Sequence, residues 1–243
     1  MSPMFHDVWI PLSRSPAFGI ALTLIGYQLG CRLQRCLRGN PLCNPVLIAI
    51  GSIIAVLLLT GTDYRTYFET ASWIHFLLGP ATVALAIPLY KNIGEIRRAA
   101  LAIGAAVGAG AFAASGSAMA IAWSLGASPT VIRSIAAKSV TTPIAMGVSA
   151  QIGGIPELTA VLVVVTGVFG SLCAPEIAAV LGVRCWRARG LAAGVAGHGI
   201  ATARMLCLNE TAGAFSGLAM GLCGLLTAVC LPVIFHFLHL DAW

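Results

Sequence analysis

Six long apolar stretches, separated by short loops, constrain this chain more than any other feature of its sequence. A helix needs about 20 apolar residues to cross the hydrocarbon core of a bilayer, and each stretch reaches that length with its flanks or with tilt. Only 9% of the residues are charged, whereas a soluble domain carries about 25%. The sequence therefore predicts an all-α integral membrane protein, with stretches at about 17–31, 45–60, 72–90, 99–125, 158–182 and 211–238.

These stretches leave little chain for a soluble domain, so we expect a single membrane domain over residues 1–243. Residues 1–16 contain Pro3, Asp7, Pro11 and Pro16. They lack the basic region and apolar core of a signal peptide, and we interpret them as a leader segment that is not cleaved. The eight cysteines show no metal-binding spacing, and no enzymatic motif is present. We therefore expect no metal, no cofactor and no enzyme activity.

The formal net charge of +6 could indicate a nucleic-acid partner, but the placement of the charges argues against one. Basic residues in short loops between membrane spans are retained on the cytoplasmic side. Nine of the fourteen basic residues lie in three such loops: Arg32, Arg35 and Arg38; Lys91, Arg97 and Arg98; Arg184, Arg187 and Arg189.

Two further segments, about 133–151 and 188–208, combine charges with runs of Gly, Ser, Thr or Pro. If 133–151 crossed the membrane completely, the third basic loop would lie outside. If both segments enter and return as re-entrant hairpins, from opposite faces, all three basic loops lie inside. The sequence thus predicts about six full transmembrane helices plus two re-entrant or broken segments in an inverted-repeat-like arrangement. An arrangement of eight broken-helix crossings stays open.

Lys138 and Arg204 lie well inside these two segments, where a charge costs about 2.5–3.5 kcal/mol at the bilayer centre. One interpretation is that each cation pairs with a buried acid and only holds the bundle together. The acids available for this are Glu157, Glu176 and Glu210. The other interpretation is that the two cations form a positive, water-accessible pocket for an anion.

The neighbouring residues favour the anion pocket. Pro143 removes a backbone hydrogen bond, and the free N–H groups at the start of a half-helix attract a carboxylate or phosphate. In the second segment, glycines flank a histidine, and a guanidinium suits bidentate carboxylate recognition. The candidate substrate-binding residues are Lys138, Ser139, Thr141, Thr142, Pro143, His198, Gly199, Thr202 and Arg204.

Five short motifs follow one another along the chain: Gly79-Pro80, Lys138-Ser-Val-Thr-Thr-Pro-Ile-Ala-Met146, Ile152-Gly-Gly-Ile-Pro156, His198…Thr202-Ala-Arg204 and Gly213-Ala-Phe-Ser216. In this order and spacing they resemble the LrgB family, and the resemblance runs from about residue 17 to 235. That family includes the CidB and LrgB proteins, first described as holin/antiholin-like regulators of murein hydrolase and lysis. It is also similar to the C-terminal half of the plastidial glycolate/glycerate translocator.

The resemblance implies a multi-pass carrier in the bacterial inner (cytoplasmic) membrane for small monocarboxylates of the glycolate, glycerate, pyruvate and lactate class. It also implies an LrgA-like membrane subunit as partner, and it leaves a homo-oligomer open. The alternative is a holin/antiholin-like, pore-forming regulator of murein hydrolase activity and lysis. Cys207 stands where an acid is common in the family, so the candidate coupling residues are Glu210 and Glu157.

Overall fold

The computed structural model describes residues 9–37, 45–84 and 86–237, and within these ranges it is helical with no strand. The chain divides into two compact units, residues 1–84 and 85–243, whereas the sequence predicted one membrane domain. Residues 1–8 of the predicted leader and Arg38 of the first basic loop lie outside the described residues. The first unit contains α2 (Pro16–Cys36), α3 (Pro45–Thr60), α4 (Tyr64–Thr70) and α5 (Ser72–Ala84).

In the first unit, α2 and α3 pack antiparallel through small residues. A Cβ on Gly30 would overlap the backbone of Pro45, and one on Gly26 would lie 2.9 Å from Ser52 Oγ. Small residues allow membrane helices to approach this closely. The helices α2 and α3 cover the first two predicted spans.

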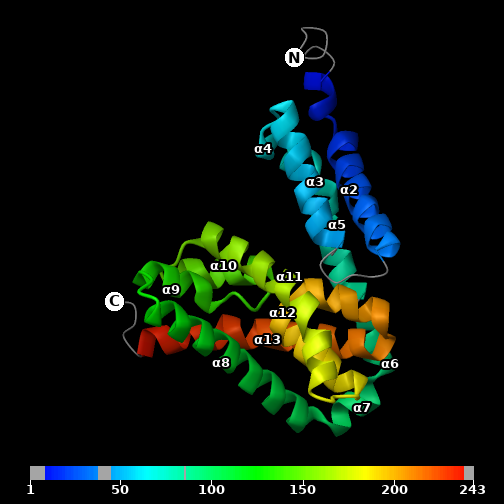
Figure 1. The fold of residues 1–243 in the computed structure, drawn as a ribbon. Helices are drawn as coiled ribbons and strands as arrows, with labels where there is room; N and C mark the ends of the chain where they lie inside the picture. Colours follow the sequence, from blue (N-terminus) through cyan, green and yellow to red (C-terminus); the bar gives the residue numbers. More distant parts are fainter. Residues whose placement is uncertain (1–8, 38–44, 85, 238–243) are drawn as a thin grey trace. The chain divides into compact units, whose positions relative to one another are not determined.

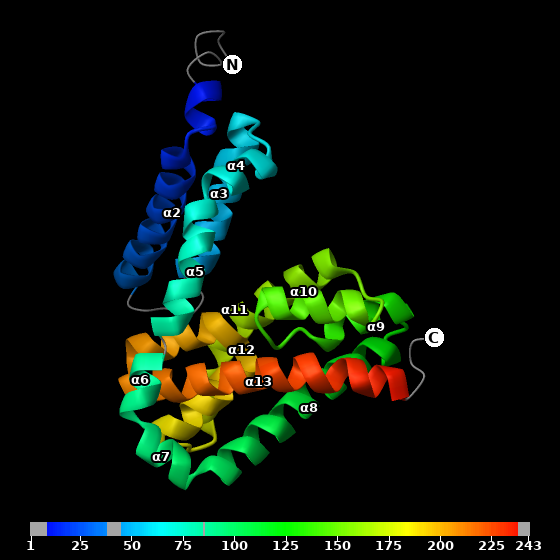
Figure 2. The ribbon, with the colours of Figure 1, turned by 180° about the vertical axis from the view of Figure 1, so that it is seen from behind.

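The second unit begins with two short helices and ends with the longest one (Figures 1 and 2). The predicted span 72–90 is divided between α5 in the first unit and α6 in the second. Among the described residues, four helices are long and apolar enough to cross a membrane, namely α8, α11, α12 and α13. The elements are α6 (Ala86–Lys91), α7 (Ile93–Arg98), α8 (Ala100–Ser124), α9 (Pro129–Ala136), α10 (Thr142–Gln151), α11 (Pro156–Val180), α12 (Trp186–Leu208) and α13 (Glu210–Phe237).

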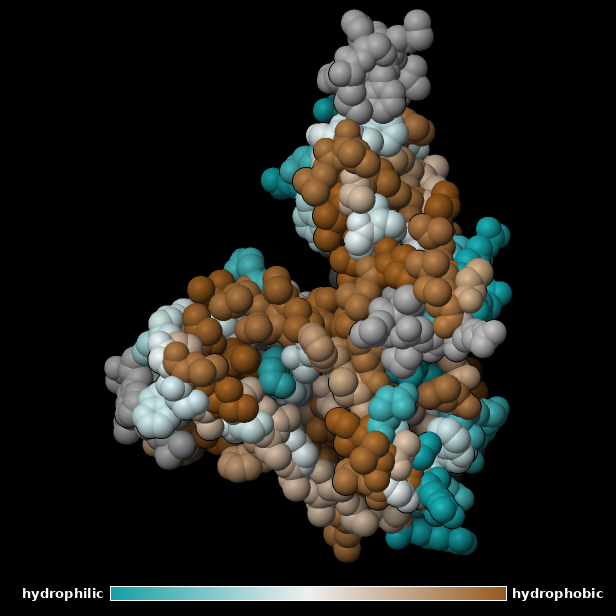
Figure 3. All heavy atoms as spheres, in the orientation of Figure 1, coloured by the Kyte–Doolittle hydropathy of each residue, from teal (hydrophilic) through white to brown (hydrophobic). Residues whose placement is uncertain are grey.

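Two ion pairs gather the second and third basic loops at the start of α13. Lys91 Nζ lies 2.8 Å from Glu210 Oε1, and Arg187 Nη1 lies 3.2 Å from Glu95 Oε2. Hydrophilic residues, drawn in teal, gather around α6 and α7 in Figure 3. We call this end of the second unit the basic end. The two loops therefore lie at one end, as the sequence predicted, and their orientation toward the cytoplasm by the positive-inside rule stays a prediction.

The helix α12 satisfies the length of a membrane span, but it is a re-entrant hairpin. Its backbone leaves the helical region at Gly197 and His198, which separates an incoming arm (186–196) from a returning arm (199–208). Both arms contact the start of α13. A Cβ on Gly190 would meet Ala212, and one on Gly213 would meet Leu206. The hairpin therefore enters from the basic end and returns to it.

The helices α9 and α10, which precede α12 in the chain, form the first hairpin, and α12 is the second. The first hairpin enters from the other end of the unit. Residues at the start of α9 lie near Trp123 and Phe235, at the ends of α8 and α13. At the far end of α10, a Cβ on Gly154 would lie 3.1 Å from Ser134 Oγ. Both ends of this hairpin thus lie at the end where α13 finishes, which we call the opposite end.

The second unit therefore has three full spans, α8, α11 and α13, and two hairpins that enter from opposite ends. The predicted all-α fold with two oppositely oriented interruptions is confirmed. The alternative of eight crossings does not fit these contacts, because both arms of α12 return to the same end of α13.

Cysteine labelling tests this topology. The exposed Cys185 caps α12 at the basic end, and the backbone N–H of Ala188 and the Arg187 guanidinium hold the pKa of its thiol below the usual range. Since the thiolate is the reactive form, Cys185 as the only cysteine should react readily with a membrane-impermeant maleimide in inside-out vesicles and not in intact cells.

The matched variant, Ser128→Cys in the cysteine-free background, places an exposed thiol at the opposite end. It should react in intact cells instead. Labelling of both cysteines from the same side of the membrane would refute the opposed arrangement.

Candidate functional site

The tip of the first hairpin is an irregular turn, residues 137–141, that leads into the start of α10. Thr141 is the N-cap of α10, and Pro143 lies in the first turn, where its fixed φ suits a helix start. The backbone N–H groups of Thr142 and Ile144 are free of helical partners at this position. Within the described residues, the hydroxyls of Thr141 and Thr142 have no hydrogen-bond partner, so this helix start offers several unused donors.

Lys138 brings a positive charge to the same turn. Its side chain is half-buried, and its Nζ lies 3.4 Å from Ser139 Oγ. None of the ion pairs among the described residues involves Lys138; four of the six acids there pair with Arg65, Lys91, Arg187 and Arg204. A partly desolvated cation without a counter-charge is unfavourable, and an anion bound beside it would remove that cost.

The tip of the second hairpin centres on His198. Its φ of 38° is the only positive φ of a non-glycine residue in the described part of the chain, and such backbone strain persists only where the surroundings enforce it. The ring is buried, and its Nε2 lies 3.0 Å from the carbonyl oxygen of Val163. Because a carbonyl only accepts, Nε2 carries the hydrogen.

Thr202 stabilises this tip from the returning arm. Its hydroxyl lies 2.7 Å from the carbonyl oxygen of His198 and 2.9 Å from Ser216 Oγ of α13. It can therefore donate to the carbonyl and accept from the serine. These contacts use the donor and one of the two acceptor sites of the hydroxyl. Thr202 thus stabilises the bend, and its part in substrate binding stays a prediction.

The two tips meet inside the second unit. The His198 ring contacts the carbonyl oxygen of Val163 on α11. Residues of both tips also belong to one buried cluster, with Ala137 and Val140 from the first hairpin and Val195 from the second, joined by Val163 of α11. The structure thus brings together the two segments that the sequence singled out.

Arg204, on the returning arm of α12, is bound by α11. Its Nη1 donates to the carbonyl oxygen of Ser171, and its Nη2 lies 3.7 Å from Glu176 Oε1. The Ser171 carbonyl is available because Pro175, four residues later, has no N–H to donate to it. This matches the interpretation in which a cation pairs with an acid and holds the bundle together.

The two predicted coupling acids lie away from the hairpin tips, whereas Gly199 directly follows His198. Glu210 pairs with Lys91 at the basic end. Glu157 is exposed in the first turn of α11 at the opposite end. Gly199 begins the returning arm, and a Cβ there would lie 3.8 Å from Met220 Sδ, an ordinary contact. The coupling role of the two acids stays a prediction.

A buried polar cluster at the base of the first hairpin was not predicted from the sequence. Thr159 Oγ1 lies 2.9 Å from the Ser134 carbonyl oxygen and 2.7 Å from Ser149 Oγ, while Ser134 Oγ accepts from the Ile155 N–H at 2.8 Å. All three hydroxyl residues are fully buried. Their serine and threonine spacing carried no signal, because the cluster forms only when α9, α10 and α11 converge.

Removing the Arg204 side chain tests its assignment. Hydrogen bonds to a charged group contribute about 1.5–3 kcal/mol each, so Arg204→Met should lower the free energy of unfolding by about that amount and reduce Tm in a thermal scan of the purified protein. Arg97→Met, which changes an exposed arginine without an ion pair among the described residues, serves as the control. Unchanged stability together with lost anion binding would show that Arg204 is instead a ligand.

The fold and the site define the chain as a multi-pass α-helical membrane protein with paired, oppositely oriented re-entrant hairpins. The model of the LrgB-like family matches residues 23–237, which span both compact units, and the chain belongs to that family.

Three curated relatives match nearly the whole chain. An uncharacterised protein of Haemophilus influenzae is 33% identical over 90% of this chain and 94% of its own length. The holin-like protein CidB of Staphylococcus epidermidis is 33% identical over 88% and 93%. The uncharacterised protein YxaC of Bacillus subtilis is 34% identical over 91% and 96%. No solved structure matches the chain.

Proposed function

We propose that this protein is a membrane carrier for small monocarboxylates and that the turn before α10 binds the carboxylate. One observation carries the proposal: Lys138 is half-buried without an acidic partner among the described residues, at a helix start with two unused threonine hydroxyls. The ammonium group, the hydroxyls of Thr141 and Thr142 and the N–H groups of the first helical turn together supply the donors that a carboxylate requires.

The balance of charge supports a substrate with a single negative charge. Of the two cations predicted for the site, Arg204 is neutralised by Glu176, which leaves Lys138 alone. A second carboxylate would have no cation to offset its desolvation. Glycolate, glycerate, pyruvate and lactate each carry one carboxylate, so they fit the site better than C4 dicarboxylates.

The opposed hairpins support transport rather than simple binding. Helix interruptions from opposite faces that meet inside a bundle are typical of secondary transporters, whose gates open alternately around a fixed site. We further propose that the protein resides in the bacterial inner membrane and works with an LrgA-like membrane subunit. Its substrate would be released unchanged, so the proposed function requires no enzymatic step.

The names of the relatives favour a second candidate function. The CidB proteins matched here are described as holin-like, which suggests a pore or a pore regulator that acts in lysis. A pore of that kind passes solutes by size and needs no specific anion site.

Solute flux into liposomes containing the purified protein distinguishes the two functions. A carrier predicts saturable uptake of radiolabelled glycolate or lactate, with competition by unlabelled monocarboxylates and none by succinate. A pore predicts linear, size-selective leakage of neutral solutes as well, and that result would contradict the carrier. The measurement is repeated with an LrgA-like protein in the same liposomes to test the partner.

A further inference from the structure

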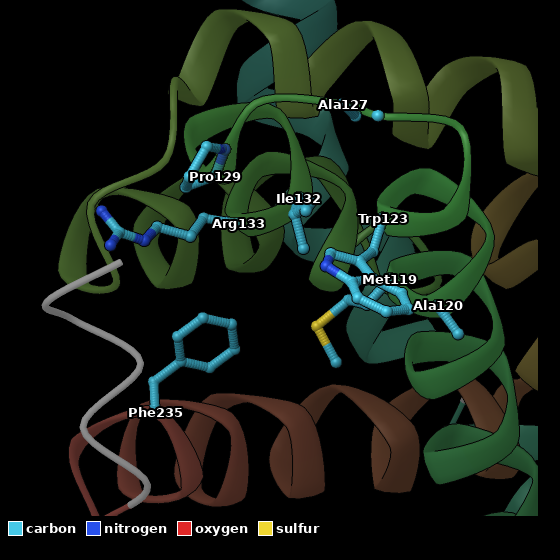
Figure 4. A pocket seen from close by; sticks show the side chains of 9 residues that line it. Met119, Ala120, Trp123, Ala127, Pro129, Ile132, Arg133 and Phe235 are labelled. Carbon is cyan, nitrogen blue, oxygen red and sulfur yellow. The ribbon is translucent and has the colours of Figure 1, made fainter.

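A pocket of about 490 Å³ lies at the opposite end of the second unit, apart from the hairpin tips. Figure 4 shows it between the end of α8, the start of α9 and the last turns of α13. Its walls are apolar, formed mainly by Met119, Trp123, Ile132 and Phe235. Arg133 is the only charged residue among the described residues that line it.

The pocket is polar at one side and apolar at the other. In Figure 4 the Arg133 side chain extends away from Trp123 and Met119. Arg133 is half-buried, and a Cβ placed on Gly153 would lie 3.0 Å from its Nη1. The guanidinium therefore lies against the turn between α10 and α11 and is held near the mouth of the pocket.

The position of the pocket suits an amphiphile from the bilayer. Trp123 is 67% exposed, and Leu125 nearby is 80% exposed, at the end of a helix that is long and apolar enough to span the membrane. Tryptophan at a span end marks the boundary between acyl chains and headgroups. A pocket at this depth has acyl chains on one side and lipid phosphates on the other.

From this geometry we propose that the pocket binds an anionic phospholipid. An acyl chain lies against Met119, Ile132 and Phe235, where the flexible thioether of Met119 adapts to its shape. The headgroup phosphate lies at Arg133, whose planar guanidinium binds phosphate oxygens in pairs. The bound lipid connects α8, α9 and α13, and α9 is the first arm of the hairpin that carries Lys138. This lipid site does not depend on the proposed carrier function.

Lipid binding is measured by native mass spectrometry of the purified protein with phosphatidylglycerol or phosphatidylcholine. The wild-type protein should retain phosphatidylglycerol about tenfold better, as expected for one favourable charge interaction. Inorganic phosphate should not displace the phosphatidylglycerol, because the acyl chain of the lipid contributes to binding. Displacement by phosphate alone would instead indicate a free-anion site and would overturn the proposal.

Two variants distinguish the contribution of the lipid's acyl chain to binding from that of its headgroup. Ala120→Trp fills the pocket from α8 and should abolish retention, whereas Ala105→Trp, also exposed on α8, should not. Arg133→Gln should remove the preference for phosphatidylglycerol and leave weak binding of both lipids. If Ala120→Trp does not fold, Arg133→Gln alone decides the question. Equal retention by Ala120→Trp and Ala105→Trp, or an unchanged preference in Arg133→Gln, would refute the lipid site.

Discussion

Replacing Lys138 with alanine is expected to reduce monocarboxylate uptake by about 10- to 100-fold at low substrate concentration. Lys138 is the cation of the proposed site, and a hydrogen bond to a charged group contributes about 1.5–3 kcal/mol, where 1.4 kcal/mol corresponds to a factor of ten. The folded protein should be at least as stable as the wild type, because the variant no longer has to bury a charge without an acidic partner. Initial uptake rates and a thermal scan measure the two effects.

Lys91→Ala is the matched control for this variant. It also removes a lysine from the second unit, but Lys91 is 62% exposed and paired with Glu210 at the basic end, away from the hairpin tips. We expect its uptake to stay near that of the wild type. Lys138→Arg, which keeps the charge but changes its shape, should retain part of the activity. Equal losses of uptake in Lys138→Ala and Lys91→Ala would show that uptake depends only on the net charge of the protein, which would contradict the proposed site.

A loss of stability comparable to that of Arg204→Met is expected from adding a methyl group where the second hairpin packs. A Cβ on Gly170 of α11 would lie 2.6 Å from Gly197 Cα and 2.8 Å from the Ala196 carbonyl oxygen, and one on Gly194 would overlap the Ser216 carbonyl oxygen. These neighbours are backbone atoms, which cannot rotate away. Overpacking of this kind costs about 1–3 kcal/mol at each site, so Gly170→Ala and Gly194→Ala should each lower Tm by several degrees in a thermal scan.

Gly104→Ala is the control for the glycine series. It makes the same change within a helix, but no atom lies within 4 Å of the added Cβ. Since alanine favours a helix over glycine, its Tm should stay unchanged or rise. If Gly170→Ala and Gly194→Ala are as stable as this control, α12 does not pack as closely against α11 and α13 as described.

The sequence predicted the elements of the second unit well because their signals are local. The glycines on either side of His198 indicated a break, and the structure has non-helical angles at Gly197 and His198. Pro143 indicated the start of a half-helix, and α10 begins at Thr142. The positive-inside rule orders loops by charge alone, and it correctly brought the second and third basic loops to one end.

The contacts of the site could not be predicted to the same degree, because they depend on packing between distant segments. Arg204 finds its partner only because the returning arm of α12 packs against α11, next to the carbonyl oxygen that Pro175 leaves free. The sequence alone does not give this packing. The sequence named Glu176 only as one of three available acids. The hydrogen bonds of Thr202 to His198 and Ser216 depend on the same kind of packing, and its predicted part in substrate binding stays a prediction. The lipid-facing pocket at Trp123 carried no motif, since its walls are ordinary apolar residues.

Titration of the purified protein with a monocarboxylate tests the central claim most directly, because it measures binding without transport or gating. Calorimetry with glycolate or lactate should show one saturable site per chain in the wild-type protein, no detectable binding in Lys138→Ala, and wild-type affinity in Lys91→Ala. Binding of equal affinity in Lys138→Ala and the wild type would contradict the assignment of the site to the hairpin tips.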